Sequence, residues 1–282
     1  MSEQLVSNSI GRQYWIYSGD SFYQQRIANA GPYQKHNLLR LRQLVPNART
    51  VIDAGMNIGM NTIEYATWAQ NVHGFEPTKQ TYDMAEKNIE LAKRQTDADF
   101  KKGWFPDKTQ ISGWASPVIT GNIHTYNCAL GEKRDTVDIL IKKNNAGHNH
   151  VDNIHIPTSN GKSRVRKVEP EKEQVDVYTL DSYNFTDVDI IKVDTEGFEF
   201  AVVKGAENTI MKHLPVVQLE MVESHAKKFG YSCQDVYDWF TARDFVSTLS
   251  TGTVDGSTWY YVPKKMERFF IHKSKMATQL PL

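Results

Sequence analysis

A short segment that begins at Asp53 carries residue types suited to ligand binding. Asp53-Ala-Gly-Met-Asn-Ile-Gly59 follows an apolar run, and Gly55 and Gly59 allow the backbone to approach a ligand closely. Glu76 ends the next apolar run, about 20 residues further on, where a carboxylate can accept hydrogen bonds from both hydroxyls of a ribose. Asp53 could act on a cationic group directly or through an ordered water. The pattern predicts a site for a ribose-containing ligand.

A second group of acidic residues ends two later apolar runs. Asp194 and Glu196 follow the run that begins at Ile190, and Glu220 ends the run that begins at Val216. A carboxylate at such a position could remove or orient a hydroxyl proton. Asp194 and Glu196 could instead cap the helix that follows. Lys192 shares a strand face with Asp194, so it could form an ion pair with Asp194 or contact a substrate.

Apolar runs and helical periodicity alternate along the chain, which predicts the elements that position these residues. The predicted strands are 50–53, 72–75, 124–130, 189–194 and 216–221, and the predicted helices are 61–68, 78–93, 200–214 and 234–243. Residues 245–249 and 259–262 read as a closing antiparallel pair. The alternation predicts an α/β fold with a Rossmann-like, mostly parallel, doubly wound sheet, an antiparallel C-terminal hairpin and an inserted β-hairpin.

Two insertions interrupt the alternation. Residues 103–121 lie between a helix and the next strand, which places them at the amino ends of the strands and favours packing or a partner contact. Residues 132–180 follow a strand, and their segments 137–141 and 175–180 read as a hairpin around a polar loop that could act as a lid. His148 and Asn149 in this loop are candidate substrate contacts, or belong to a mobile surface loop. The spacing of His148 and His150 makes a metal site conceivable, but no specific metal motif is present and we predict none.

The composition is that of an ordinary globular protein. Lys plus Arg and Asp plus Glu each number 33, so no net field favours nucleic acid or an anionic membrane. The sequence has neither a run of about 20 apolar residues nor a secretory leader, which predicts a cytoplasmic protein without a membrane partner. Two cysteines are too few for a disulfide framework. The length favours one domain over 1–282, with a lead-in (1–48), a core (50–221) that contains the insertion, and closing elements (222–282).

Several ordered motifs make the chain similar to the FkbM family of methyltransferases. The similar text is Val51-Ile-Asp-Ala-Gly-Met-Asn-Ile-Gly59, Gly74-Phe-Glu-Pro77, Ala129-Leu-Gly131, Thr179-Leu-Asp181, Ile191-Lys-Val-Asp-Thr-Glu-Gly-Phe-Glu199, Lys204-Gly-Ala206 and Leu219-Glu220. Asn88, in the predicted helix that follows Gly74–Pro77, also matches the family pattern. The resemblance implies a class I methyltransferase fold that binds S-adenosylmethionine. It also implies methyl transfer to a hydroxyl oxygen, often of a sugar or natural product.

With that resemblance, the candidate residues divide into three groups. The cofactor group contains Asp53, Gly55, Asn57, Gly59, Glu76, Asn127 and Ala129. The catalytic group is Asp194, Glu196 and Lys192, and the substrate group is His148, Asn149 and Glu220. We expect a small-molecule or glycan acceptor, and no oligomeric state follows from the sequence.

Two other functions compete with this one. Lys192, Asp194, Glu220 and the basic segments would also suit a ribose 2′-O-methyltransferase acting on RNA, although the neutral total charge and the lack of an RNA-binding module disfavour it. A non-catalytic cofactor-binding scaffold is the other alternative, and the intact acidic residues argue against it.

Overall fold

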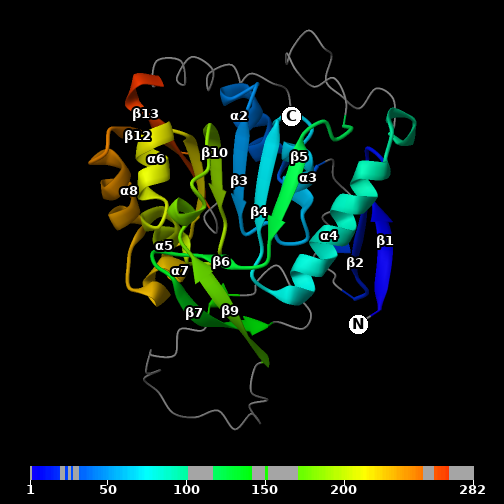
Figure 1. The fold of residues 1–282 in the computed structure, drawn as a ribbon, viewed down its shortest axis with the longest axis horizontal. Coiled ribbons are helices and arrows are strands. Elements are labelled where there is room, and N and C mark those ends of the chain that lie inside the picture. Colours follow the sequence, from blue (N-terminus) through cyan, green and yellow to red (C-terminus); the bar gives the residue numbers. More distant parts are fainter. Residues whose placement is uncertain are drawn as a thin grey trace.

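The computed structural model describes residues 2–19, 23–24, 27, 32–100, 117–141, 150–151, 171–249 and 257–266. A seven-stranded sheet lies at its centre (Figure 1). In spatial order the strands are β12 (Phe245–Leu249), β13 (Ser257–Pro263), β11 (Val216–Met221), β10 (Val188–Val193), β3 (Thr50–Ala54), β4 (Asn71–Phe75) and β5 (Asn122–Tyr126). β13 pairs antiparallel with β11 and β12, and the pairs from β11 through β5 are parallel. The predicted Rossmann-like α/β fold with a closing antiparallel hairpin is confirmed.

Helices cover both faces of this sheet. They are α2 (Lys35–Leu44), α3 (Met60–Tyr65), α4 (Lys79–Arg94), α5 (Glu199–Lys204), α6 (Glu207–His213), α7 (Glu223–Ala226) and α8 (Cys233–Thr241). Alternate residues of β10 enter different cores, because side chains alternate across a strand. Ile190 packs with leucines of α2, and Ile191 packs with apolar residues of α5, α6 and α8. Burial on both faces explains the nearly continuous apolar sequence of β10.

The inserted hairpin belongs to a second, smaller sheet. Its strands, in spatial order, are β6 (Ala129–Leu130), β9 (Glu171–Tyr178), β7 (Asp135–Ile141) and β8 (His150–Val151). β7 and β9 pair antiparallel, as the sequence predicted for the insertion, and extend below the main sheet in Figure 1. The loop between β8 and β9 and most of insertion 103–121 lie outside the described residues.

Two predicted elements are divided in the structure. The strand expected over 124–130 consists of β5, which ends at Tyr126, and β6, which leaves the main sheet and pairs with β9. The helix expected over 200–214 consists of α5 and α6, interrupted at Gly205. A Cβ atom on Gly205 would lie 1.9 Å from the carbonyl oxygen of Gly131, so this close approach of two backbone segments requires glycine.

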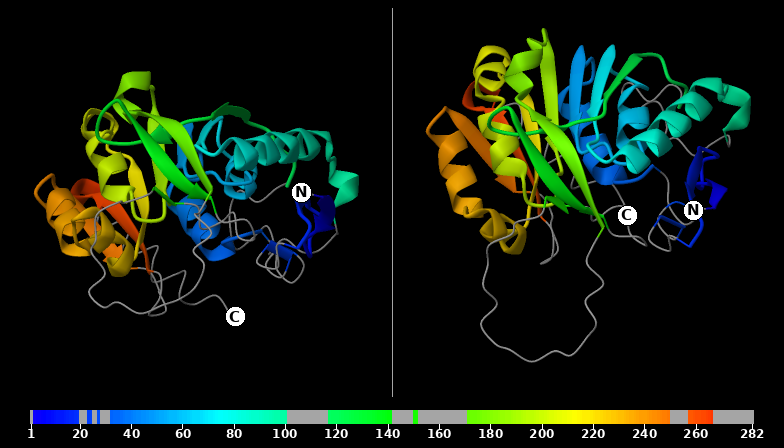
Figure 2. Two further views of the ribbon diagram at one scale, coloured as in Figure 1. Left: turned by 90° about the horizontal axis from the view of Figure 1, so that it is seen from below. Right: turned by 60° about the horizontal axis from the view of Figure 1, so that its bottom comes forward.

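The segment described from sequence as a lead-in forms regular structure. β1 (Glu3–Ser7) and β2 (Gln13–Tyr17) form an antiparallel hairpin, and β2 packs beside α4 (Figure 2). Tyr14 and Ile16 of β2 share a core with residues of α3 and α4. Short 3-10 turns occur at η1 (Asp97–Asp99), η3 (Leu180–Tyr183), η4 (Lys227–Phe229) and η5 (Lys264–Met266). Within the described ranges, no helix has both the length and the apolar character needed to cross a membrane.

Candidate active site

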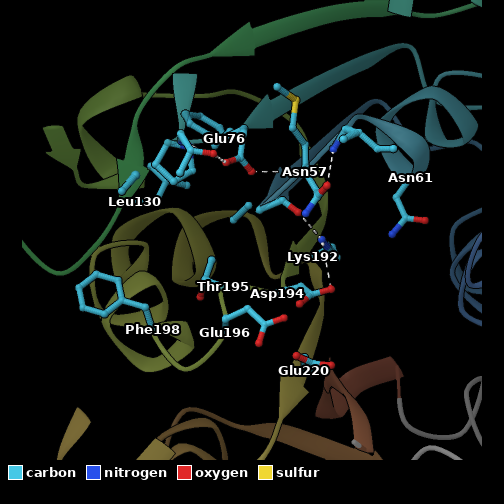
Figure 3. Close-up of a pocket in the computed structure, with 18 of the residues that line it drawn as sticks. Asn57, Asn61, Glu76, Leu130, Lys192, Asp194, Thr195, Glu196, Phe198 and Glu220 are labelled. Carbon is cyan, nitrogen blue, oxygen red and sulfur yellow. Dashed lines mark hydrogen bonds and ion pairs between the residues drawn. The ribbon is translucent and has the colours of Figure 1, made fainter. Parts of the chain in front are cut away.

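A cavity of about 310 Å³ opens where the parallel strands end. The loops after β3, β4 and β10 and the end of β11 contribute its polar wall, and Leu130, Ile139 and Val151 of the second sheet border it. Figure 3 shows Glu76 and Asn57 on one side of this cavity and Asp194, Glu196 and Glu220 on the other. The crevice at the carboxyl ends of the strands is where open α/β sheets bind ligands. The structure therefore brings Glu76 and the second predicted group, Asp194, Glu196 and Glu220, to one cavity.

The glycine loop after β3 lies directly against the loop after β10. Gly55 and Gly59 have φ angles of 82° and 86°, and Asn57 between them also has a positive φ of 52°. A Cβ atom on Gly55 would lie 1.9 Å from the carbonyl oxygen of Asp194. Only glycine avoids this clash, so the loop can line the cavity with backbone while it contacts the residue that ends β10.

Lys192 lines the cavity and connects the two loops. Its Nζ donates a 2.8 Å hydrogen bond to the carbonyl oxygen of Gly55 and lies 3.0 Å from Asp53 Oδ1 and 3.6 Å from Asp194 Oδ2. Burial opposes the charged form, yet the charges of Asp53 and Asp194 raise the pKa of Lys192 above its usual range. Of the two roles left open by the sequence, the geometry favours the ion pair.

Asp53 lies beneath the residues that line the cavity. Its side chain is fully buried, accepts a 2.6 Å hydrogen bond from the Thr62 hydroxyl and pairs with Lys192. Asp53 is thus the partner that holds Lys192 in place. Its action on a cationic ligand group, directly or through an ordered water, stays a prediction.

Glu76 lies in the cavity wall at the end of β4. Its Oε1 accepts hydrogen bonds from the amide and hydroxyl of Thr78, at 3.1 and 2.7 Å, and its Oε2 accepts one from the amide of Asn57 at 3.2 Å. Burial raises the pKa of Glu76 to about 7, because the charged carboxylate loses its hydration and these hydrogen bonds compensate only partly. The carboxylate is thus fixed in orientation at the position expected for a ribose partner.

The loop after β10 is held by a buried carboxylate. Glu199 Oε1 accepts hydrogen bonds from the amides of Thr195 and Gly197, at 2.8 and 3.0 Å, and its Oε2 accepts one from the Tyr231 hydroxyl at 3.1 Å. Glu196 lies between those two amides with a positive φ of 56°. Glu199 therefore organises the turn that presents Asp194 and Glu196, and does not itself line the cavity.

Glu220 completes the acidic side of the cavity from the end of β11. The negative charge of Asp194, followed by burial, raises the pKa of Glu220 to about 9. Glu220 therefore retains its proton at neutral pH. Within the described residues, Glu196, Glu220 and His225 also offer ligand atoms that lie within 4.8 Å of one another, a spacing that could hold a metal ion.

The remaining predicted residues have mixed positions. Ala129 lines the cavity, whereas the side-chain amide of Asn127 donates to the carbonyl oxygens of Glu76 and Pro77, at 3.0 and 2.9 Å. Asn127 thus anchors the turn that carries Glu76. His148 and Asn149 lie outside the described residues.

A sequence model described as the methyltransferase FkbM domain matches residues 53–247, more than half of the chain. The chain belongs to the FkbM methyltransferase family. S-adenosylmethionine is its cofactor. A search of curated protein sequences found no match.

Solved methyltransferase structures resemble this FkbM methyltransferase at low identity. The methyltransferase FkbM from Methylobacillus flagellatus KT is 16% identical, with a TM-score of 0.46 over 76% of this chain and 44% of that one. The present chain thus spans less than half the length of that protein. An rRNA methylase from Streptococcus thermophilus is 10% identical (TM-score 0.42, 83% and 97% coverage). The O-methyltransferase from Bacillus cereus, in complex with SAH, is 14% identical (TM-score 0.41, 83% and 82% coverage).

The cavity of this FkbM methyltransferase also contains residues that the sequence analysis did not select. Tyr23, Tyr33 and Gln34 of the N-terminal segment line it. The Tyr23 hydroxyl donates a 2.6 Å hydrogen bond to Asn57 Oδ1, and Gln34 Oε1 accepts one from Asn61 at 3.1 Å. These contacts join the N-terminal segment to the glycine loop. In the sequence, the only signal for these residues was their aromatic or amide character shortly before the first core strand. Their spacing follows no recognised binding pattern.

Proposed function

We propose that this protein methylates a hydroxyl oxygen on a sugar, a glycan or a small natural product. One observation supports this above the others: the carboxyl groups of Asp194 and Glu220 converge on the cavity opposite Glu76, where an acceptor hydroxyl next to the cofactor would lie. An alcohol must lose a proton when it accepts a methyl group, so a proton acceptor is needed on that side.

The opposite wall supports a cofactor role. When bound, S-adenosylmethionine supplies an electrophilic methyl group on a sulfonium. Glu76 would accept the ribose hydroxyls, while Gly55, Asn57, Gly59 and Ala129 would shape the surface beneath the ligand. Glycine at position 55 lets this wall close against the backbone of Asp194, because a Cβ atom there would lie 1.9 Å from the Asp194 carbonyl oxygen.

Asp194 is the proposed base or orienting group for the acceptor hydroxyl. Lys192 holds it from below, and Glu199 holds the turn behind it. Glu196 is the substitute base, and Glu220 would bind acceptor hydroxyls. Because both loops are fixed by buried contacts, the residues can orient the acceptor with little reorganisation.

The acidic wall also separates this proposal from its alternatives. RNA brings a phosphate next to every ribose, and the carboxylates of Asp194 and Glu196 would repel it, so a ribose acceptor in RNA has less support. A scaffold role would require no base. A cofactor-binding scaffold would still need the glycine loop that Lys192 anchors, but it would not need Asp194 and Glu220 on the opposite wall.

The proposal is tested with S-adenosylmethionine that carries a deuterated methyl group. The protein is incubated with monosaccharides, oligosaccharides, hydroxylated natural products and a short RNA, and products are identified by mass spectrometry. We expect labelled methyl ether from a sugar or small-molecule alcohol. Asp194→Asn should reduce turnover by about 10²- to 10⁴-fold, and the exposed control Asp83→Asn should not. Labelled RNA alone, or methylation of nitrogen, would contradict the proposal.

A further inference from the structure

A second cavity of about 630 Å³ adjoins the candidate active site. It lies between the turn before β7, helix α5, and the segment from η4 to α8. Phe198 lines both this cavity and the one that contains Asp194 and Glu220. The two cavities are therefore neighbours, with Phe198 between them. We call the second cavity the aromatic groove.

Aromatic side chains form the floor of the aromatic groove. They are Phe198, Phe200, Phe229, Tyr231 and Trp239. Phe198 and Phe229 meet edge to face at 5.6 Å, and the rings of Phe200 and Tyr231 are 5.4 Å apart. Arg243 lies 3.9 Å from the Trp239 ring, and the Tyr231 hydroxyl bonds to the carbonyl oxygen of Gly197. The rings are thus held in place and remain partly exposed to the groove.

Charged side chains surround this aromatic floor. Glu132, Asp135 and Asp235 are exposed at the rim, together with Lys133 and Lys204. Lys204 pairs with Glu132 at 3.2 Å and lies 4.7 Å from the ring centre of Phe200. The rim therefore offers hydrogen-bond acceptors and donors directly above flat apolar surfaces.

A pyranose ring has matching chemistry. Its C–H face packs on an aromatic ring, and its equatorial hydroxyls donate to carboxylates and accept from ammonium groups at the periphery. Nucleobases also stack on aromatic rings, but the three carboxylates and two ammonium groups of this rim give no positive field for phosphates.

We propose that the aromatic groove binds a sugar unit next to the one that is methylated, so that the acceptor is an oligosaccharide or glycoconjugate rather than a monosaccharide. This inference rests on the proposed O-methyltransferase function. It adds a second binding site and a minimum acceptor length of two sugar units.

The test compares groove variants by glycan-array binding of the protein saturated with S-adenosylhomocysteine. Phe200→Ala and Trp239→Ala each remove one aromatic surface of the groove. Tyr237→Ala is the matched control, because Tyr237 is an exposed aromatic of the same helix as Trp239 and does not line the groove. If the alanine variants fail to fold, the double variant Glu132→Gln, Asp135→Asn tests the rim instead, since both residues are exposed.

We expect the wild type to bind oligosaccharides of two or more units, and the groove variants to bind them about 3- to 10-fold more weakly. Tyr237→Ala should bind like the wild type. Calorimetry should show unchanged affinity for S-adenosylhomocysteine in every folded variant.

Failure of this inference is distinguishable from failure of the proposed function. A wild type that binds no glycan, or that binds monosaccharides equally well, overturns the inference, as do groove variants with undiminished binding. The inference would also be overturned if the wild type bound RNA or an apolar peptide and the groove variants did not. Methylation of a monosaccharide would still support the proposed function. A wild type that does not bind S-adenosylhomocysteine would count against that function itself.

Discussion

The ammonium group of Lys192 donates a 2.8 Å hydrogen bond to the carbonyl oxygen of Gly55. This contact joins the end of β10 to the glycine loop after β3, two segments that are far apart in the sequence. The same ammonium group neutralises the buried carboxylate of Asp53. One side chain therefore connects the proposed cofactor loop with the proposed acceptor side, so its removal should affect both.

Lys192→Met should lower the free energy of unfolding by about 3–5 kcal/mol, because it leaves Asp53 as a buried carboxylate without an oppositely charged partner. It should also weaken the binding of S-adenosylhomocysteine, because the glycine loop loses its anchor. Denaturant unfolding and calorimetry measure the two effects. Lys212→Met, an exposed position on α6, is the control. A stable variant with normal affinity would show that Lys192 does not organise the site.

The elevated pKa of Glu76 predicts pH-dependent cofactor binding. With a pKa of about 7, the carboxylate is largely protonated at about pH 6 and largely ionised at about pH 8. If the charged form accepts the ribose hydroxyls, affinity for S-adenosylhomocysteine should rise over this range. Glu76→Gln should abolish the rise and cost about 1.5–3 kcal/mol of binding free energy at the upper end. Calorimetry across the range tests this, and a parallel rise in the variant would assign the effect to another group.

Glu220 should make the protein less stable as the pH increases. Its folded-state pKa of about 9 lies above the ordinary value of 4.5, so the folded protein retains a proton that the unfolded chain releases. The resulting stabilisation is complete below the ordinary pKa and is lost as the pH rises through about 9. Glu220→Gln should flatten the fall in melting temperature with pH. A slope equal to that of the wild type would show that Glu220 ionises normally.

Glu199 should act by positioning the turn after β10. Glu199→Ala removes the acceptor for the amides of Thr195 and Gly197 and should cost about 1–3 kcal/mol of stability. Methyl transfer should fall, whereas the affinity for S-adenosylhomocysteine should change little. Glu90→Ala, at an exposed residue that pairs with Lys93, is the control. Reduced cofactor affinity with normal turnover would contradict the positioning role.

We expect methyl transfer to persist without a divalent metal. Lys192 already compensates the charge of Asp194, and His225 Nδ1 lies 3.7 Å from Glu196 Oε2. Turnover is measured in chelator, before and after magnesium is added. If turnover is lost completely in chelator and returns when magnesium is added, the first candidate metal ligands would be Glu196, Glu220 and His225.

Much of the fold follows from the sequence because its signals are local. Continuous apolar runs predict buried strands, and their order with the intervening helices predicts a doubly wound sheet whose carboxyl ends share one edge. This is sufficient to bring Glu76, Asp194 and Glu220 together. The motifs from Val51 to Glu220 also carry the family resemblance.

Only the tertiary structure decided which of these residues reach the cavity. Asp53 and Asn127 carry the same local signals as Glu76 and Ala129, yet the first two turn toward partners beneath or beside the cavity. Lys192 and Tyr23 act through contacts with residues many positions away, and no local periodicity encodes such a contact. The physical reason is that strand alternation determines the face to which a side chain points, whereas packing between distant segments determines what it meets there.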